Sequence, residues 1–313
     1  MIKRSLLCTF ILLLLHLLLV THFPFLGTST HQWQENVCKA QRFMYSDGRD
    51  IAMVGTSLSY RLKADSIPFV CSLSFAGCSV EDGLNIILSR DIIPKYIIIE
   101  SNFFFKESSP GLFWNISEGA LPIIRKLIPS LREQYSPICL FHSFNDIYNY
   151  SIKPKFFEKK TTIENKLSNE DTHTNKSSID MKTLNMEVER RILSDKPLPE
   201  DKMITRKKKL KGLIKRLEDR GATIVFFEMP VNERILHLKS NNQTREVLKQ
   251  EFPPIHYKYL GQDTAVYLTN DGIHMNEDEA IRYSHFLKQI ISEELSINKN
   301  STIVDGKNVK LTK

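Results

Sequence analysis

Tryptophan is scarce in this chain, with two among 313 residues, and aromatic side chains are not interleaved with arginines. Much of the net charge of +7 sits in local runs such as Arg206, Lys207, Lys208 and Lys209. A protein that binds nucleic acid usually presents its basic residues on one continuous face. The composition therefore argues against a nucleic-acid partner.

The sequence also lacks the patterns that hold cofactors. None of the cysteines is spaced as Cys-x-x-Cys, and no other spacing suits a zinc site. The glycine-rich loops that bind dinucleotides and phosphates are missing as well. We therefore expect no metal and no cofactor. Four of the five cysteines are expected either to form disulfides in an oxidising compartment or to stay free and buried: Cys38, Cys71, Cys78 and Cys139.

An uninterrupted apolar run opens the chain. Lys3 and Arg4 precede SLLCTFILLLLHLLLVTHF, which is roughly long enough to span a bilayer. Basic residues on the short N-terminal side favour the cytoplasm, so the rest of the chain is expected on the other side of the membrane. A cleaved signal peptide is the alternative, but FPFLGTSTHQ offers no clear small-x-small cleavage site. We predict a single-pass anchor over 1–24 and a polar stalk over 25–48.

Residues 49–295 are predicted to form one α/β domain. Short apolar runs typical of buried strands are DIAMVG (50–55), IPFVCSLSF (67–75), KYIIIES (95–101) and ATIVFFEMP (222–230). Helices are predicted over 80–88, 116–131 and 205–221, with a closing amphipathic helix over 276–295. This alternation predicts a mainly parallel sheet.

Two polar segments depart from that pattern. Residues from about 150 to 203 are charged, rich in Ser, Thr and Asn, and poor in periodic apolar residues. They are predicted to form an insertion outside the core, with a loop or lid near the active-site rim. Residues 296–313 are predicted to be a polar C-terminal tail.

Polar or small residues follow the predicted strands. Ser57 follows the first strand, Gly77 the second and Asn102 the third, while Asp271 and His274 lie near the C-terminus. In parallel α/β sheets, ligands bind beyond the carboxyl ends of the strands. These side chains are therefore expected to meet at one rim.

The residue types at this rim are those that acyl transfer requires. A serine hydroxyl such as that of Ser57 needs a base, and His274 is the candidate. Asp271 is close enough in sequence to orient the imidazole. The oxyanion of a tetrahedral intermediate needs donors, which the N–H groups of Gly77 and Ser57 and the amide of Asn102 can supply.

Four short segments together resemble the blocks of the SGNH (GDSL-like) hydrolase superfamily, in the same order. They are GTSLS (55–59), the glycine of SFAGCS (74–79), the asparagine of ESN (100–102) and DGIH (271–274). The N-terminal anchor, the GTS-type first block and the DGxH last block are most similar to the membrane-anchored branch. That branch includes the D-alanine transfer protein of teichoic-acid modification and the alginate O-acetylation proteins. The resemblance implies a flavodoxin-like three-layer α/β/α fold and ester hydrolysis or acyl transfer on glycans.

Two blocks depart from the superfamily pattern. Thr56 stands where many members carry Asp, and the third block reads ESN instead of G-x-N-D. Asn145, in SFND (143–146), is an alternative to Asn102 for the third block. Asn102 is preferred because it directly follows the strongest strand signal in the chain.

Three functions fit the sequence. The first is an extracytoplasmic esterase or O-acyltransferase that modifies cell-surface polysaccharide through an acyl-serine, with a membrane O-acyltransferase as a candidate partner. The second is an anchored esterase for lipids or small esters. The third is a non-catalytic glycan-binding module. The complete Ser57, Asp271 and His274 set speaks against the third.

Overall fold

The computed structural model describes residues 2–22, 31–46, 48–148 and 181–295. The chain divides into two compact units. The sheet unit combines Ser46–Phe113 with Ile179–Lys313, and the anchor unit combines Met1–Tyr45 with Trp114–Ser178. The single domain predicted over 49–295 differs from this division, because Trp114–Ser178 group with Met1–Tyr45.

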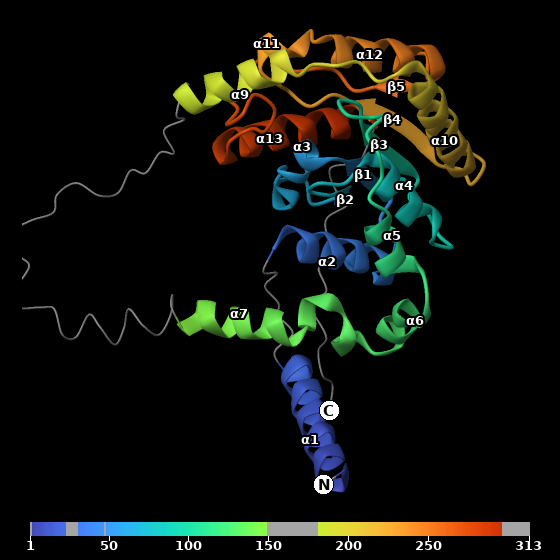
Figure 1. The fold of residues 1–313 in the computed structure, drawn as a ribbon. Helices are drawn as coiled ribbons and strands as arrows, with labels where there is room; N and C mark the ends of the chain where they lie inside the picture. Colours follow the sequence, from blue (N-terminus) through green and yellow to red (C-terminus); the bar gives the residue numbers. More distant parts are fainter. Residues whose placement is uncertain (1, 23–30, 47, 149–180, 296–313) are drawn as a thin grey trace, which may run out of the picture. The chain divides into compact units, whose positions relative to one another are not determined.

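The sheet unit is built on five parallel strands in the order β2-β1-β3-β4-β5 (Figure 1). The strands are β1 (Ile51–Gly55), β2 (Val70–Ser74), β3 (Tyr96–Glu100), β4 (Thr223–Phe227) and β5 (Lys258–Tyr259). This is the order of flavodoxin-like doubly wound sheets. The predicted α/β class with a mainly parallel sheet is confirmed. The two-residue edge strand β5 was not predicted, because two residues carry too little apolar periodicity.

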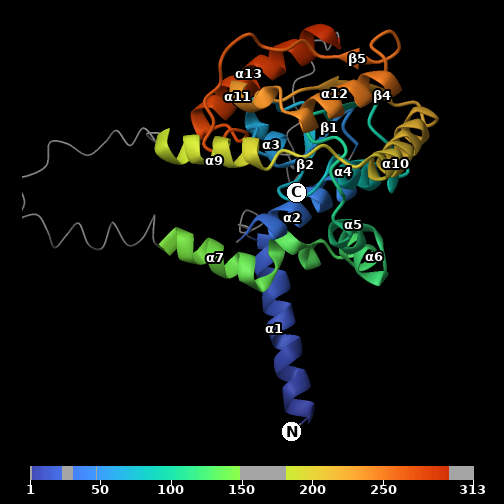
Figure 2. The same cartoon turned by 45° about the horizontal axis from the view of Figure 1, so that its top comes forward.

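Helices cover both faces of this sheet. Met53 of β1 belongs to the same buried cluster as the apolar side of α13 (Glu277–Glu294). Successive side chains in a strand point to opposite faces, and the next residue, Val54, lies directly against Gly83 of α4 (Val80–Leu88). The two helices therefore lie on opposite sides of the sheet, as Figures 1 and 2 show. The three-layer arrangement follows from this packing.

The closing helix α13 begins where the sequence predicts. The side-chain oxygen of Asn276 accepts a hydrogen bond from the Glu279 N–H at 2.8 Å, which caps the first turn. The apolar residues of its buried face are Ala280, Tyr283, Leu287 and Ile291, as expected of an amphipathic helix. This packing fixes the loop that precedes α13.

The sheet unit contains further helices, three short and three longer ones. The short ones are α3 (Ser57–Tyr60), the 3-10 turn η1 (Ala64–Ser66) and α11 (Glu233–Leu236). The longer ones are α9 (Met181–Leu193), α10 (Glu200–Glu218) and α12 (Lys239–Glu251). Figure 2 shows α9 beside α11, where Arg234 pairs with Glu189.

The predicted insertion at 150–203 is only partly described. Its residues 150–180 lie outside the described part of the chain, and 181–203 contribute no strand. However, Leu184 and Val188 of α9 are 5% and 1% exposed and belong to the core cluster. The prediction that this segment stays outside the core is therefore wrong for α9. Two apolar residues four positions apart suffice to anchor one helix face.

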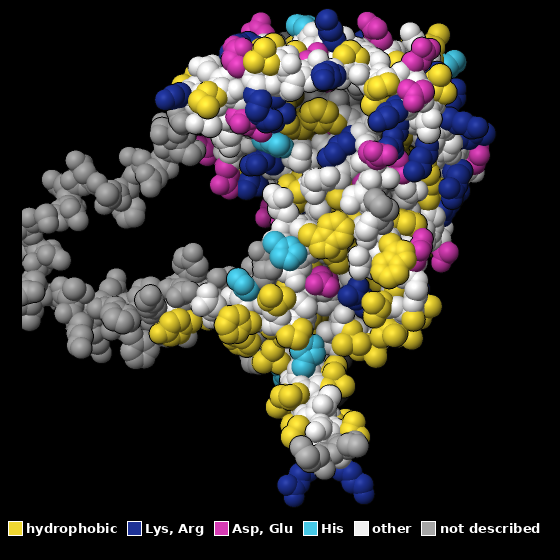
Figure 3. All heavy atoms as spheres, in the orientation of Figure 1, with side chains coloured by type: hydrophobic (Ala, Val, Ile, Leu, Met, Phe, Trp, Pro, Cys, Tyr) yellow, Lys and Arg dark blue, Asp and Glu magenta, His cyan; other side chains and the backbone are white. Residues whose placement is uncertain are grey.

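The anchor unit contains the helix predicted to span a membrane. Helix α1 (Ile2–His22) holds a stretch, Lys3–His22, that is long and apolar enough to cross a bilayer, with a mean hydropathy of 2.2. In Figure 3 its surface is largely hydrophobic, with Lys and Arg side chains at its free end. A signal sequence near an N-terminus can have the same length and apolar composition.

Other helices of the anchor unit differ from the predictions. The stalk predicted over 25–48 contains α2 (Gln32–Tyr45), an amphipathic helix with buried Val37 and Phe43. The single helix predicted over 116–131 is instead α5 (Pro110–Ser117), α6 (Ala120–Leu127) and the 3-10 turn η2 (Pro129–Leu131). The break coincides with Gly119, whose φ is +79°. A second 3-10 turn, η3 (Glu133–Tyr135), leads into α7 (Pro137–Ile147).

No disulfide joins the cysteines in the part of the chain that the structure describes, which agrees with the second of the two alternatives expected for Cys38, Cys71, Cys78 and Cys139. Cys38, Cys78 and Cys139 are buried. Burial raises the pKa of Cys38 and of Cys78 to about 12, because the thiolate loses its hydration. These thiols are therefore unreactive at neutral pH. The predicted C-terminal tail, 296–313, lies outside the described residues.

Candidate active site

Ser57 is the first residue of α3 and directly follows the loop at the carboxyl end of β1. Thr56 caps this short helix, with its hydroxyl accepting from the Leu58 N–H at 3.3 Å. The N–H of a first helical residue has no partner within its own helix. Ser57 therefore presents a half-buried hydroxyl and a backbone donor at the same strand end.

Asp271 and His274 form one compact turn. The Asn270 N–H donates to the His274 carbonyl at 2.8 Å and closes it. Inside the turn, Asp271 Oδ1 accepts from the N–H groups of Ile273 at 3.2 Å and His274 at 2.8 Å. An aspartate that caps its own backbone in this way fixes its side-chain direction. The second carboxylate oxygen is left facing the His274 ring.

The turn also depends on Gly272. Its φ is +91°, in the left-handed region that L side chains rarely adopt. A Cβ at this position would lie 2.9 Å from Val188 of α9. The Gly272 carbonyl accepts from the Asn232 N–H at 2.8 Å, so the turn is attached to the loop before α11.

The structure brings the three predicted catalytic residues together. His274 Nε2 lies 3.0 Å from Ser57 Oγ, and His274 Nδ1 lies 2.8 Å from Asp271 Oδ2. An ionised carboxylate can only accept hydrogen bonds, so Nδ1 carries the proton. Nε2 is then the free base that faces the serine hydroxyl. This arrangement can transfer the Ser57 proton to His274.

Asp271 is held in its charged form. Burial alone raises the pKa of this carboxyl, but hydrogen bonds from the His274 ring and from the His274 N–H outweigh burial. The pKa of Asp271 therefore lies well below its usual value. The carboxylate stays negative over the whole neutral range, where it can stabilise an imidazolium.

Arg191 of α9 binds the same aspartate. Its Nη2 donates to Asp271 Oδ2 at 3.0 Å, and its Nε donates to the Asp271 carbonyl at 3.0 Å. Sequence reasoning missed it because it lies in the segment assigned to a polar insertion. The sequence pattern that could have identified Arg191 is its spacing from Leu184 and Val188. This spacing places two core residues and the arginine on one helix face.

We expect Arg191→Met to lower kcat for ester turnover by about tenfold with little change in KM. The arginine contacts Asp271 and not the predicted serine nucleophile, and a hydrogen bond to a charged group is worth about 1.5–3 kcal/mol. Steady-state kinetics of the full chain measures both constants. The matched control is Arg190→Met, because Arg190 pairs with Glu187 on an exposed face. A rise in KM alone, or an equal loss in the control, would contradict a positioning role.

A buried carboxylate, Glu100, holds the serine loop. It lies at the end of β3 and is fully buried. Its Oε1 accepts from the Thr56 hydroxyl at 2.6 Å, and its Oε2 accepts from the Thr56 N–H at 2.9 Å. Oε2 also accepts from Ser59, from the N–H at 3.1 Å and from the hydroxyl at 2.5 Å. The residues on either side of Ser57 are thus fixed by one side chain.

The close approach of Glu100 explains Gly55, the first glycine of the GTSLS block. A Cβ on Gly55 would lie 1.9 Å from Ser59 Oγ and 2.6 Å from Glu100 Oε2. Only glycine leaves room for the carboxylate to reach the loop. Sequence reasoning noted Glu100 at the strand end but assigned it no role.

Gly77 lies after β2, as predicted, with a φ of +78°. The hydrogen bonds found among the described residues leave its N–H without an acceptor. Its carbonyl and that of Cys78 accept from Lys106 Nζ at 2.9 and 3.0 Å. Gly77 is therefore held by its carbonyl while its N–H remains available.

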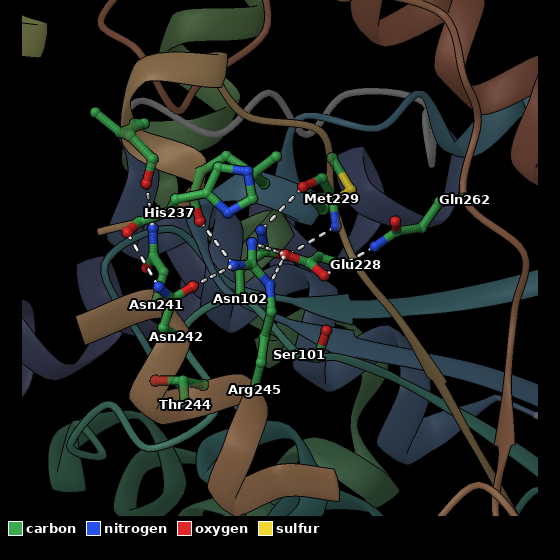
Figure 4. Close-up of polar contacts among 12 residues, drawn as sticks. Ser101, Asn102, Glu228, Met229, His237, Asn241, Asn242, Thr244, Arg245 and Gln262 are labelled. Atoms are coloured by element: carbon green, nitrogen blue, oxygen red, sulfur yellow. Dashed lines mark hydrogen bonds and ion pairs between the residues drawn. The ribbon is translucent and has the colours of Figure 1, made fainter. Parts of the chain in front are cut away.

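Asn102 lies just after β3, as predicted, but its amide makes contacts that were not predicted. Its Nδ2 donates to the Met229 carbonyl at 2.9 Å, and its Oδ1 accepts from the Met229 N–H at 2.7 Å (Figure 4). The pair ties the ends of β3 and β4 together. One of the two amide hydrogens remains free to donate. The alternative, Asn145, lies inside α7 and does not follow a strand.

Next to Asn102, Glu228 takes part in a separate polar cluster. Its Oε1 accepts from Arg245 at 2.5 and 2.9 Å, and its Oε2 accepts from Gln262 at 2.9 Å (Figure 4). Both carboxylate oxygens are therefore engaged in joining α12 to the loop after β5. These contacts give Glu228 a structural role.

Comparison with known protein families found no matching family model, and comparison with curated proteins found no match.

Proposed function

We propose that this chain is a serine acyl-ester hydrolase or O-acyltransferase of the SGNH type that acts on cell-surface polysaccharide outside the cytoplasm. The observation that carries the proposal is the continuous chain of contacts from Ser57 Oγ to His274 Nε2 at 3.0 Å, and from His274 Nδ1 to Asp271 Oδ2 at 2.8 Å. The order of the four sequence blocks supports the same reading.

In the first half of the proposed reaction, Ser57 Oγ attacks the acyl carbon while its proton moves to His274 Nε2. The imidazolium is stabilised by the charged Asp271. The tetrahedral intermediate then collapses, the bond to the leaving alcohol breaks, and the alkoxide takes the proton from Nε2. The acyl group is left on Ser57 as an ester.

In the second half, an acceptor hydroxyl attacks the acyl-serine. His274 removes its proton, and the Ser57 oxygen takes that proton back as the new ester or acid leaves. Water as acceptor gives hydrolysis, and a sugar hydroxyl gives transfer. A membrane O-acyltransferase that delivers the acyl donor is the partner we propose for the transfer reaction.

The negative oxygen of each tetrahedral intermediate needs donors. The proposed donors are the N–H of Gly77, the N–H of Ser57 and the free amide hydrogen of Asn102. The open N–H of Gly77 and the fixed orientation of Asn102 support these roles.

Ester turnover by the full chain and by Ser57→Ala tests the proposal. An acetyl ester is supplied with or without an oligosaccharide acceptor, and released acetate and acetylated sugar are measured. Turnover that depends on Ser57 supports acyl-ester chemistry, and acetylated sugar supports transfer. Preferred hydrolysis of long-chain esters would favour an anchored lipid esterase instead. Turnover that is absent from both proteins, together with glycan binding, would favour a non-catalytic module.

The sheet unit is proposed to lie outside the cytoplasm, because Lys3 and Arg4 precede the apolar part of α1. We therefore expect protease added to spheroplasts of an expressing bacterium to digest the sheet unit. Immunoblotting of the full chain follows the digestion, with a cytoplasmic protein as the control for intact cells. Complete protection of the chain until the membrane is permeabilised would contradict this topology.

A further inference from the structure

Helix α6 of the anchor unit is amphipathic but buries none of its residues. Leu121, Ile123 and Leu127 are 55%, 64% and 74% exposed. At 100° per residue these side chains share one side of the helix, and Arg125 and Lys126 lie on the other. Arg125 forms an ion pair with Glu133, with 3.4 Å between Nη2 and Oε2. The polar side is thus held by the protein, while the apolar side is uncovered in the described structure.

Helix α7 repeats this arrangement. It buries Cys139 and Leu140 on one side. Ile138, Phe141 and Phe144, spaced three residues apart, are 54%, 70% and 46% exposed. In Figure 3, hydrophobic side chains gather over α6 and α7. Exposed apolar surface of this extent marks a binding surface rather than ordinary solvent-facing surface.

Contacts with α1 indicate how deep this surface lies relative to a membrane that α1 would cross. His16 Nε2 donates to the Ser130 carbonyl of η2 at 3.2 Å, and Val20 of α1 packs against Leu140 of α7 in a buried pair. His16 lies six residues before His22, the end of the stretch that can cross a membrane, or about 9 Å along the helix axis. If α1 crosses a bilayer, η2 and α7 lie at the depth of its outer third.

We propose that α6 and α7 lie in the outer interface of the membrane, with their apolar side chains inserted among the lipid acyl chains. Amphipathic helices at an interface bury their apolar face about 5–10 Å into the boundary between headgroups and acyl chains. That depth agrees with the position of His16. The chain therefore binds lipid through a helical unit as well as through a single spanning helix. The proposal depends on α1 crossing a membrane and not on the reaction at Ser57.

A lipid surface fits better than a water-soluble partner. Helix α1, which contacts η2 and α7 through His16 and Val20, is itself apolar and exposed beside these contacts, where Leu15 and Leu18 are 56% and 48% exposed. A soluble protein cannot reach side chains at the depth of His16. Lys126 is exposed beside the apolar face of α6, where a cation can meet phosphate headgroups.

Tryptophan fluorescence in vesicles tests the proposal. The chain has two tryptophans, Trp33 and Trp114. The double variant Trp33→Phe, Trp114→Phe therefore has no tryptophan fluorescence of its own. Single reporters are introduced as Leu127→Trp on α6 and Phe141→Trp on α7. Ile255→Trp is the control, because Ile255 is an 83% exposed apolar residue of the sheet unit. The full chain is reconstituted in phosphatidylcholine vesicles, and part of the lipid carries bromine on its acyl chains.

We expect brominated acyl chains to quench both reporters by at least half, relative to unbrominated vesicles, and iodide in the water to have little effect on them. The control should show the reverse. Quenching of the two reporters by iodide would overturn the proposal, because the face would then be in water. Resistance to both quenchers would also overturn it and would point to a second copy of the chain over α6 and α7.

Discussion

Ser57→Ala is expected to lower acyl-ester turnover by roughly 10³- to 10⁶-fold, the loss seen when a serine nucleophile is removed from a triad. Alanine has no oxygen to carry the acyl group, so the two-step route through an acyl-serine is closed. Residual turnover would come from direct attack of water on the ester, with the oxyanion donors still stabilising the tetrahedral intermediate. His274→Ala should cost a similar factor, because Nε2 lies 3.0 Å from the serine oxygen.

Asp271→Asn should cost less than either change. An asparagine keeps an oxygen that can accept from the backbone N–H groups of Ile273 and His274, so the turn is preserved. The lost charge still weakens the stabilisation of the imidazolium. The pH dependence of turnover provides a check, because the low pKa of Asp271 means that the wild-type carboxylate is not protonated in mildly acidic solution.

Two substitutions outside the site serve as controls. Ser292 bonds the Lys288 carbonyl on α13, and His285 is exposed on the same helix. Ser292→Ala and His285→Ala should retain full turnover. Unfolding midpoints of all variants should stay close to the wild-type value, because Ser57 and His274 are only half-buried. Near-native turnover by Ser57→Ala would remove the basis for an acyl-serine mechanism.

Short-range patterns account for what the sequence could predict. Buried strands such as KYIIIES are continuous apolar runs, and parallel strands end at the same rim, so residues after different strands were expected to meet. The Asp271–His274 turn was predictable because its contacts lie within four residues. Ser57 is 217 residues away, yet its position follows from the strand that precedes it.

Long-range polar contacts explain what the sequence could not predict. The spacing of Arg191 from Leu184 and Val188 places it on the buried side of its helix, but it does not indicate that Arg191 binds Asp271 eighty residues later. The amide of Asn102 binds the backbone of Met229, which any residue type could offer. Helices α2 and α7 of the anchor unit were missed for a different reason. Amphipathic periodicity indicates that a helix has an apolar side, but not whether protein or lipid covers it.

The largest effect on stability is expected from Glu100→Ala. Glu100 is fully buried and accepts four hydrogen bonds, two from Thr56 and two from Ser59, which are themselves 1% and 0% exposed. A buried donor that loses its acceptor costs about 1–3 kcal/mol. Rotation of the hydroxyls recovers part of this, since Ser59 also bonds Ser74 at 2.7 Å. We expect a loss of about 3 kcal/mol or more in the free energy of unfolding.

The same substitution should lower turnover at least a hundredfold, because Ser57 lies between the two residues that Glu100 holds. Denaturant unfolding followed by circular dichroism measures the first effect, and ester kinetics in native conditions measures the second. Glu100→Gln should fall between wild type and Glu100→Ala: its amide oxygen can still accept, but its NH₂ group faces donors. Glu246→Ala, at an exposed position on α12, is the control and should change stability by less than about 0.5 kcal/mol. If Glu100→Ala had the same free energy of unfolding and the same ester turnover as the wild type, the Glu100 carboxylate would not be what positions the serine loop.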